Sequence, residues 1–256
     1  MPSAPAMIIA QISDTHIALD TPDADRRLHD FESTIAHINT LDPLPDVVVH
    51  TGDIAHNGRP NEYAAAAGIL AEARAPIYVI PGNKDNRSNL HAVLSPLGYL
   101  NSGSDFIEYA VKDHPVRLIA VDTLNPGSNK GDFCLERARR LIDLINAETE
   151  RPIVVFAHHP PFEVQVGPDP LNFESQEMME RLRRALQHSG RVVAVLCGHV
   201  HRGTAGWVGC IRATVMPSVA TTLRKGEYPP HMNTRPVYHL HRIDSSGTFA
   251  TESRIV

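Results

Sequence analysis

Residues 7–16 read MIIAQISDTH, a six-residue apolar run followed at once by side chains of the metal-binding type. The run at residues 7–12 has the length and composition of a buried strand. Asp14 and His16 stand two residues apart, and in an extended segment such residues point the same way. The stretch therefore predicts a strand whose carboxyl end presents a carboxylate and an imidazole to one point.

The same pattern, an apolar strand followed by polar ligand-type residues, recurs four more times. The predicted strands at 46–50, 76–80, 152–157 and 192–196 are followed by Thr51-Gly52-Asp53, Pro81-Gly82-Asn83-Lys84-Asp85, His158-His159 and Cys197-Gly198-His199-Val200-His201. In open α/β sheets ligands bind outside the carboxyl ends of strands. Five strand ends that are distant in the sequence can therefore converge on one crevice.

The remaining chain alternates helices and strands without a linker or an internal repeat. Helical spacing predicts helices over residues 26–40, 61–73, 86–97, 134–148 and 175–188. Strands at 106–111 and 116–121 are separated by a short turn, which favours an antiparallel hairpin. We predict a single α/β domain over residues 1–256, with two sheets packed between helices. The tail after about residue 210 is expected to complete the second sheet, and it can cover the site.

Composition narrows the function classes. The chain has 256 residues and a net charge of −5, which argues against nucleic acid as a partner but allows small phosphate substrates beside bound metal ions. Three cysteines do not form a disulfide framework and favour a reducing cytoplasm. No apolar run is long enough for a membrane span. The oligomeric state, including a homo-oligomer, is left open.

The residue types at the strand ends predict a metal site. Taken singly, each motif is more often a turn or a surface feature. Together they supply carboxylate and amide oxygens and imidazole nitrogens, which suit Mn, Fe, Zn or Co. Gly52, Gly82 and Gly198 each precede a candidate ligand, where a sharp turn or a close backbone approach is needed.

In these motifs the chain resembles the calcineurin-like metallophosphoesterases, in particular the bacterial branch of cyclic-nucleotide and glycerophosphodiester phosphodiesterases. The family motifs D-x-H, G-D, G-N-H-D, H and G-H-x-H fall at Asp14–His16, Gly52–Asp53, Gly82–Asp85, His158 and Gly198–His201. The resemblance covers about residues 7 to 202. It implies a four-layer α/β/β/α sandwich of two mixed sheets.

The resemblance also implies two divalent metal ions and divides the candidate ligands between them. One ion is assigned to Asp14, His16, Asp53 and His201, and the other to Asp53, Asn83, His158 and His199, so that Asp53 bridges. Such an ion pair can hold a phosphate oxygen and activate a water for in-line displacement. The nucleophile is then a metal-bound hydroxide, in keeping with the lack of a nucleophile motif elsewhere.

The sequence thus predicts a metal-dependent phosphodiesterase that hydrolyses a small diester, either a cyclic nucleotide or a glycerophosphodiester. A phosphomonoesterase or protein phosphatase on the same scaffold is the first alternative. A binding module that has kept the fold and lost its metals is the second, although the complete ligand set argues against it. A nuclease is disfavoured by the acidic charge.

Lys84 is the one departure from the family motif, which has histidine there. Three roles are open for it: a cation that clamps phosphate, a proton donor to the leaving group, or a solvent-facing bystander. Four further residues are candidates for substrate binding, each with an ordinary structural alternative such as packing or helix capping. These residues are His56, Asn57, Arg87 and His159.

Overall fold

A computed structural model gives the structure of the protein and describes residues 7–100, 105–165, 168–244 and 246–256. The first half contains β1 (Met7–Ile12), α1 (Ala24–Ile38), β2 (Val47–His50), α2 (Pro60–Ala71), β3 (Ile77–Val79), α3 (Arg87–Leu94), the 3-10 turn η1 (Ser95–Leu97), β4 (Tyr109–Val111) and β5 (Arg117–Val121). The second half contains α4 (Leu135–Asn146), β6 (Ile153–Ala157), α5 (Gln176–Leu186), β7 (Val192–Cys197), β8 (Thr204–Val208), β9 (Ile211–Val215), the 3-10 turn η2 (Pro230–Met232), β10 (Val237–Ile243) and β11 (Phe249–Ile255).

The strands form two mixed sheets. One is five-stranded in the order β11-β10-β1-β2-β3, and the other is six-stranded in the order β4-β5-β6-β7-β9-β8. In the first sheet β1, β2 and β3 are parallel, and in the second β5, β6, β7 and β9 are parallel. The carboxyl ends of parallel strands share one edge of a sheet, so each sheet brings its motif-bearing strand ends together.

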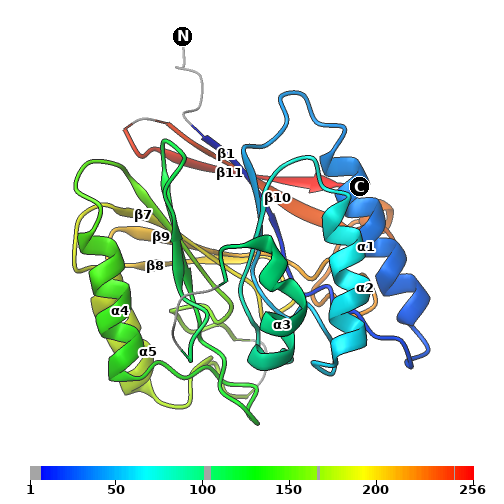
Figure 1. Cartoon of the computed structure of the whole chain (residues 1–256), viewed down its shortest axis with the longest axis horizontal. Coiled ribbons are helices and arrows are strands. Elements are labelled where there is room, and N and C mark those ends of the chain that lie inside the picture. Colours follow the sequence, from blue (N-terminus) through cyan, green and yellow to red (C-terminus); the bar gives the residue numbers. More distant parts are fainter. Residues whose placement is uncertain (1–6, 101–104, 166–167, 245) are drawn as a thin grey trace.

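Helices cover the outer faces of both sheets. Figure 1 shows α1 and α2 on the five-stranded side and α4 and α5 on the opposite side, with the two sheets between them. The predicted α/β/β/α sandwich is therefore confirmed. In the described part of the chain, no helix is both long and apolar enough to cross a bilayer.

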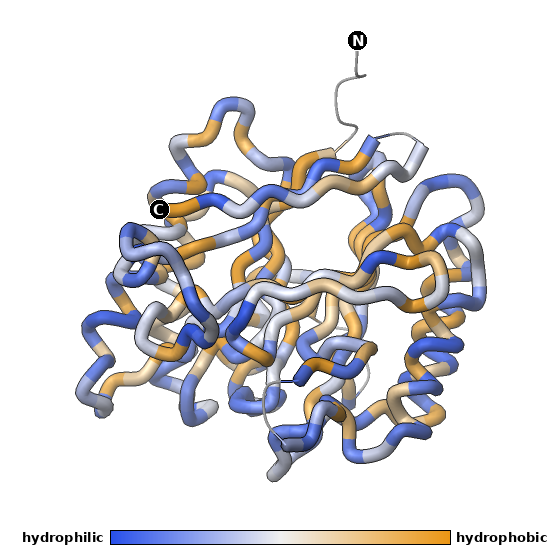
Figure 2. The backbone as a smooth tube through the Cα atoms, turned by 180° about the vertical axis from the view of Figure 1, so that it is seen from behind, coloured by the Kyte–Doolittle hydropathy of each residue, from blue (hydrophilic) through white to orange (hydrophobic). Residues whose placement is uncertain are grey.

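The apolar core explains why the layers stack. One cluster joins both sheets, because Ile9 and Ile12 of β1 are buried in the same cluster as Phe156 of β6 and Leu196 of β7. A second cluster fills the space between the six-stranded sheet and helices α4 and α5. Figure 2 shows the same division, with hydrophobic strands inside and mainly hydrophilic loops outside. Burial on both faces accounts for the nearly continuous apolar runs of the central strands.

The sequence predictions agree with the structure in element type, most bounds shift by one or two residues, and three differences are larger. The predicted 106–111 strand begins only at Tyr109, although its antiparallel pairing with β5 is confirmed. The predicted helix to residue 97 ends at Leu94 and continues as the 3-10 turn η1, since Pro96 lacks the N–H that an α-helix needs. The sequence predicts that the tail completes the second sheet, but it contributes to both sheets. Strand β9 belongs to the six-stranded sheet, whereas β10 and β11 extend the five-stranded sheet.

Candidate metal centre

The five predicted strand ends meet where the two sheets come together. Backbone hydrogen bonds fix the loops after β1 and β2 side by side: the N–H of Asp14 donates to the Gly52 carbonyl, and that of His16 to the Asp53 carbonyl, both at 3.0 Å. Across the sheets, the N–H of His199 donates to an Asp14 carboxylate oxygen at 3.1 Å. The candidate ligands are therefore assembled from both sheets.

The first donor set consists of Asp14, His16, Asp53 and His201, whose possible ligand atoms all lie within 4.8 Å of one another. The Nε2 atoms of His16 and His201 are 3.0 Å apart. His201 Nε2 lies 3.2 Å from Asp14 Oδ1, and His16 Nε2 lies 3.4 Å from Asp53 Oδ2. This set matches the first ion's ligands as the sequence predicts them.

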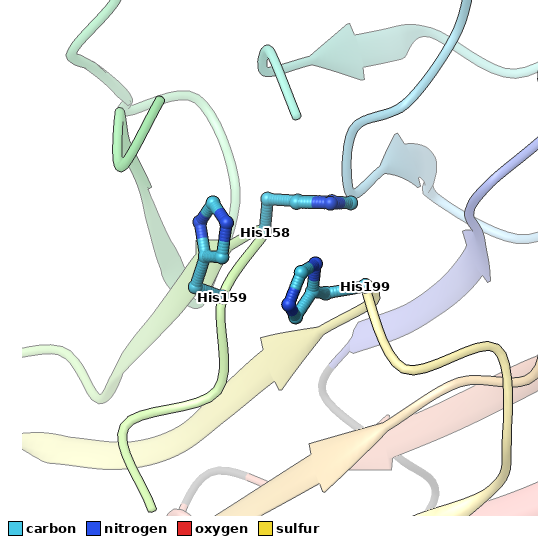
Figure 3. Close-up of side chains that lie close together, drawn as sticks. All are labelled: His158, His159 and His199. Carbon is cyan, nitrogen blue, oxygen red and sulfur yellow. The ribbon is translucent and has the colours of Figure 1, made fainter. Parts of the chain in front are cut away.

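The second donor set is centred on the amide oxygen of Asn83. That Oδ1 lies 3.0 Å from His158 Nε2 and 2.9 Å from His199 Nδ1. Figure 3 shows the imidazoles of His158 and His199 close together at the ends of β6 and β7, with His159 beside them. The ring centroids of His158 and His199 are 5.2 Å apart. These atoms converge on one point, as the second predicted ion requires.

Asp53 stands between the two donor sets. Its Oδ2 faces His16 at 3.4 Å, and its Oδ1 faces His158 Nε2 at 3.5 Å. The backbone N–H of Lys84 donates to the same Oδ1 at 2.7 Å, which fixes the orientation of the carboxylate. One carboxylate thus offers an oxygen to each set, the arrangement of a bridging ligand.

His159 lies near the second set, and its grouping with His158 and His199 makes it a geometric candidate for a ligand. Both of its ring nitrogens, however, have protein partners. Nδ1 lies 2.8 Å from the Thr123 hydroxyl, and Nε2 lies 3.2 Å from the Asn129 carbonyl. Because a carbonyl only accepts, Nε2 carries the proton, and His159 supports the wall of the site rather than presenting a free nitrogen.

The backbone is strained at five of these positions. Positive φ angles occur at Asp14 (54°), His16 (45°), Asp53 (53°), His199 (76°) and His201 (58°), and among the described non-glycine residues at no others. The left-handed region is unfavourable for such residues and persists only where the surrounding structure imposes it. Strain confined to candidate ligands is a mark of a functional site that sequence spacing could not reveal.

Close packing around the ligands explains one of the glycines. Gly52 has φ of +95°, and a Cβ added there would lie 2.7 Å from the Gly82 nitrogen and 2.7 Å from His158 Nδ1. No side chain fits between the loops after β2 and β3 at this point. The Gly-Asp sequence therefore serves both the turn and the close approach of a ligand.

Outer hydrogen bonds set the tautomers of two histidines. His158 Nδ1 donates to the Thr51 carbonyl at 2.7 Å, and His201 Nδ1 donates to the Leu223 carbonyl at 3.0 Å. Each bond leaves Nε2 of the same ring with a free lone pair directed at its donor set. This is the usual way in which proteins orient imidazole ligands.

The electrostatics of the two sets differ. Burial would raise the pKa of Asp14, but His201 and the hydrogen bonds from both neighbouring histidines hold it well below its usual value. Burial raises the pKa of Asp53 to about 6. Burial also lowers the pKa of His158 and, further, that of His199, so both rings are neutral at neutral pH. Neutral imidazoles beside buried carboxylates are ready to bind a cation.

The residues present fit two divalent ions. The Nε2 atoms of His16 and His201, 3.0 Å apart, face the same point, and the buried Nδ1 of His16 has no protein partner. Two buried carboxylates lie beside them. A cation at this point would satisfy the lone pairs and offset the buried charge. The mixed oxygen and nitrogen donors suit Mn, Fe, Zn or Co.

A cleft of about 310 Å³ opens onto both donor sets. Three lysines, Lys84, Lys130 and Lys225, line it together with five of the seven candidate ligands. The ammonium group of Lys84 donates to Asn129 Oδ1 at 2.9 Å, so this exposed side chain lies along the wall of the cleft. Asn129 also accepts from the Asn83 amide at 3.3 Å.

Sequence reasoning missed this part of the site. Asn129 and Lys130 belong to the loop after β5 and line the cleft. The sequence predicts this strand, but no motif of the metal-binding type marks its carboxyl end as part of the site. Lys225 lines the cleft from the tail, where its backbone N–H donates to the His201 carbonyl at 2.9 Å. The position of the first two after a parallel strand is the signal that would have found them.

None of the four secondary candidates, His159 included, lines the cleft. The guanidinium of Arg87 is paired with the Asp122 carboxylate through bonds of 2.6 and 2.8 Å and does not line the cleft. The Asn57 amide donates to Glu62 at 2.8 Å, in the cap of α2, and does not line the cleft. His56 packs its ring 5.6 Å from that of His16 but does not line the cleft either.

The comparisons with known proteins agree with this geometry. The model of the calcineurin-like phosphoesterase family matches residues 7–203, which include every candidate ligand. The chain belongs to the calcineurin-like phosphoesterase family. It is a metal-dependent phosphoric ester hydrolase, and two divalent metal ions are its cofactors. The predicted family, fold class and class of enzyme are confirmed.

Relatives from bacteria support the assignment. The chain is 34% identical over 246 residues to a probable glycerophosphodiester phosphodiesterase of Arcobacter nitrofigilis, with 92% of this chain and 88% of that protein covered. It is 26% identical to a 3',5'-cyclic adenosine monophosphate phosphodiesterase of Pseudomonas aeruginosa, with 96% and 89% covered. A dimetal phosphatase from Danio rerio shares the fold with a TM-score of 0.73 at 16% identity, covering 98% of this chain and 96% of its own.

Proposed function

We propose that this family member is a phosphodiesterase whose substrates are small glycerophosphodiesters, and that the four-ligand sets sharing Asp53 are its catalytic metal centre. The observation that carries the proposal is the position of Asp53, which presents one oxygen to each donor set at 3.4 and 3.5 Å. When bound, two divalent ions supply Lewis-acid activation of a phosphoryl oxygen and of water.

The protein's own groups position the substrate. Lys84, held by Asn129 beside the second donor set, places an ammonium group at the cleft wall where a phosphoryl oxygen can accept a hydrogen bond. Lys225 also lines the cleft, and its backbone is bonded to that of His201. Two cationic groups that flank the donor sets favour an anionic phosphate between them.

The choice of a glycerophosphodiester over a cyclic nucleotide rests on two observations. In the described part of the chain no Phe, Tyr or Trp side chain lines the cleft, so a nucleobase has no aromatic face for stacking. Such stacking contributes about 1–3 kcal/mol per base where proteins use it. A relative at 30% identity, from Enterobacter lignolyticus, is also named as a glycerophosphodiester phosphodiesterase. Cyclic nucleotides are the second candidate class, because the Pseudomonas relative is named for one.

The test compares four substrates with the Mn-loaded protein: glycerophosphoethanolamine, cyclic AMP, bis(p-nitrophenyl) phosphate and p-nitrophenyl phosphate. We expect kcat/KM for the glycerophosphodiester to exceed that for cyclic AMP by about tenfold or more, the effect of about 1.4 kcal/mol. Faster turnover of cyclic AMP would reassign the substrate class. Faster turnover of the monoester would favour the phosphatase alternative. The Asp53→Asn protein, prepared in parallel, serves as the control for contaminating activity.

A further inference from the structure

A buried polar chain that is separate from the ligands connects the two sheets beneath the donor sets. Its central residue is Gln11 of β1, which is fully buried. The side-chain amide of Gln11 donates to the Thr51 hydroxyl at 3.0 Å and to the Cys197 carbonyl at 2.9 Å. Thr51 follows β2 in the five-stranded sheet, whereas Cys197 ends β7 in the six-stranded sheet. One amide therefore joins the two sheets.

The orientation of this amide is determined by its partners. The Cys197 carbonyl can only accept, so the Gln11 NH2 group must face it, and Oε1 must face His241. His241 Nε2 lies 2.9 Å from that Oε1 and therefore carries the proton. His241 Nδ1 then accepts from the Thr251 hydroxyl at 2.9 Å. All donors and acceptors of Gln11 are satisfied, which makes the chain rigid.

His241 is well suited to hold this arrangement as a neutral ring. It lies fully buried on β10, and Phe249 stacks on it with 5.1 Å between ring centroids and 18° between planes. Burial lowers its pKa well below the usual value, so the ring keeps one proton and one lone pair at neutral pH. The single proton is the one that Gln11 requires.

The two strand ends that Gln11 joins lead directly to the ligands. Thr51 stands two residues before Asp53, and its carbonyl accepts the Nδ1 proton of His158. Cys197 stands two residues before His199. Each donor set takes residues from both sheets, so the separation of the sheets at this level sets the separation of the donor atoms. The bond from His199 N–H to Asp14 also links the sheets, but it runs through the ligands themselves. A further link, from the Tyr109 hydroxyl to the Val79 carbonyl, joins β4 to β3 and not the strand ends that carry Asp53 and His199.

We propose that Gln11 and His241 are a positioning pair that fixes the spacing between the two metal centres by locking the five-stranded sheet to the six-stranded sheet. The inference rests on the proposed two-metal site. Neither side chain touches substrate or metal; they act on Asp53 through Thr51 and on His199 through Cys197. Loss of the pair loosens the strained loops after β2 and β7. The second centre, which takes Asp53 from one loop and His199 from the other, then loses the most metal affinity.

The test uses the full chain with Mn²⁺ alone, without substrate. The double variant Gln11→Met with His241→Leu removes both partners of the Gln11–His241 hydrogen bond together, which limits the loss of stability. Of the groups left behind, the Thr51 hydroxyl keeps its bond to the Ile12 carbonyl and the Cys197 carbonyl keeps the N–H of Met216. We expect the second Mn²⁺ to bind about 10- to 100-fold more weakly, the range found for outer partners of metal ligands. The spin-coupled EPR signal of two adjacent Mn²⁺ ions should weaken or change, while the melting temperature of the metal-free protein shifts little.

Two matched variants separate positioning from general packing. His239 is another buried histidine of β10, with its ring centroid 5.8 Å from that of His241, but it lies outside the chain of hydrogen bonds. His239→Leu should therefore leave both Mn²⁺ affinities unchanged. His241→Gln, with Gln11 intact, retains an N–H that can reach Gln11, so it should show the coupled signal that the double variant loses. Unchanged affinities and EPR in the double variant, or an equal loss in His239→Leu, would overturn the inference. A wild-type chain without a coupled pair would instead refute the two-metal site on which it rests.

Discussion

The two donor sets share Asp53 but differ in charge. The first adds a second carboxylate, Asp14, to two imidazoles, whereas the second adds the neutral amide of Asn83. Both sets are built from both sheets, and in both a histidine has its outer nitrogen fixed by a backbone carbonyl. The difference therefore lies in the ligands themselves and not in how they are held.

This difference assigns distinct tasks to the two centres. Two carboxylates compensate most of the charge of a divalent ion, which favours tight retention. An ion in the second centre keeps more of its positive charge, and it lies beside Lys84, where the substrate phosphate is expected. We therefore expect the first centre to hold its ion more tightly and the second to contact the substrate more strongly.

The largest effect is expected from Asp53→Ala, because Asp53 is the only ligand common to both sets. We expect loss of both metal ions and of all measurable activity. Metal content by plasma emission spectroscopy and turnover of bis(p-nitrophenyl) phosphate check this. Asp53→Asn keeps the size of the side chain and tolerates the positive φ, so it should show the same loss without backbone strain. Two tightly bound ions in either variant would refute the bridging role.

A single-ion loss is expected when one histidine of each set is removed. Glycine tolerates the positive φ at both positions, so His199→Gly and His201→Gly remove the ligand without adding strain. His199→Gly should empty the second centre and leave one tightly bound ion. His201→Gly should weaken the tight centre instead. Indistinguishable metal titration curves for the two proteins would show that the sets are not separate.

The pH dependence of metal binding should distinguish the centres as well. Although burial disfavours a charged ring, the neighbouring Asp14 carboxylate raises the pKa of His201. Burial lowers the pKa of His158 and of His199. A metal must displace the His201 proton as the pH falls through its raised pKa, whereas the other two rings are already neutral. Titrations with Mn²⁺ between about pH 8 and about pH 5.5 should show the affinity gap between the centres narrowing. A difference in Mn²⁺ affinity between the two centres that widens as the pH falls would contradict the assignment of His201 to the tighter centre.

The smallest effect is expected at Lys84. Its ammonium group lines the cleft, held by Asn129, and we expect it to act as a phosphate clamp. We expect Lys84→Ala to slow nitrophenyl and alkyl diesters alike by about tenfold, which corresponds to about 1.4 kcal/mol. A loss confined to the alkyl ester would indicate that Lys84 protonates the leaving group. Equal rates for mutant and wild type would leave it without a role.

The ligands could be predicted from the sequence because each follows an apolar strand within a few residues. Parallel strands in one sheet deliver their carboxyl ends to a common edge, so Asp14, Asp53 and Asn83 follow from the pattern alone. The same reasoning applies to His158 and His199 in the other sheet. That the edges of the two sheets face each other is a property of packing: the strand ends show that convergence is possible, and the resemblance to a family gives the ligand sets that require it.

Other features depend on contacts between residues that no local pattern connects. The position of Arg87 after the Gly-Asn-Lys-Asp motif suggests a phosphate ligand, but its guanidinium is paired with Asp122, which is 35 residues away in the sequence. Gln11 and His241 are 230 residues apart, and nothing near either one indicates the other. The tail illustrates the same limit, since β10 pairs with β1 and closes the chain back on its first strand. Such long-range pairs are set by tertiary packing.

The most direct test of the central claim is a crystal structure of the Mn-loaded protein with anomalous scattering used to locate the ions. The account predicts two peaks about 3.5–4 Å apart, the spacing of two-metal hydrolase sites. One should lie among Asp14, His16 and His201, the other among Asn83, His158 and His199, with Asp53 between them. A single peak, or two peaks with Asp53 bound to only one of them, would contradict the account.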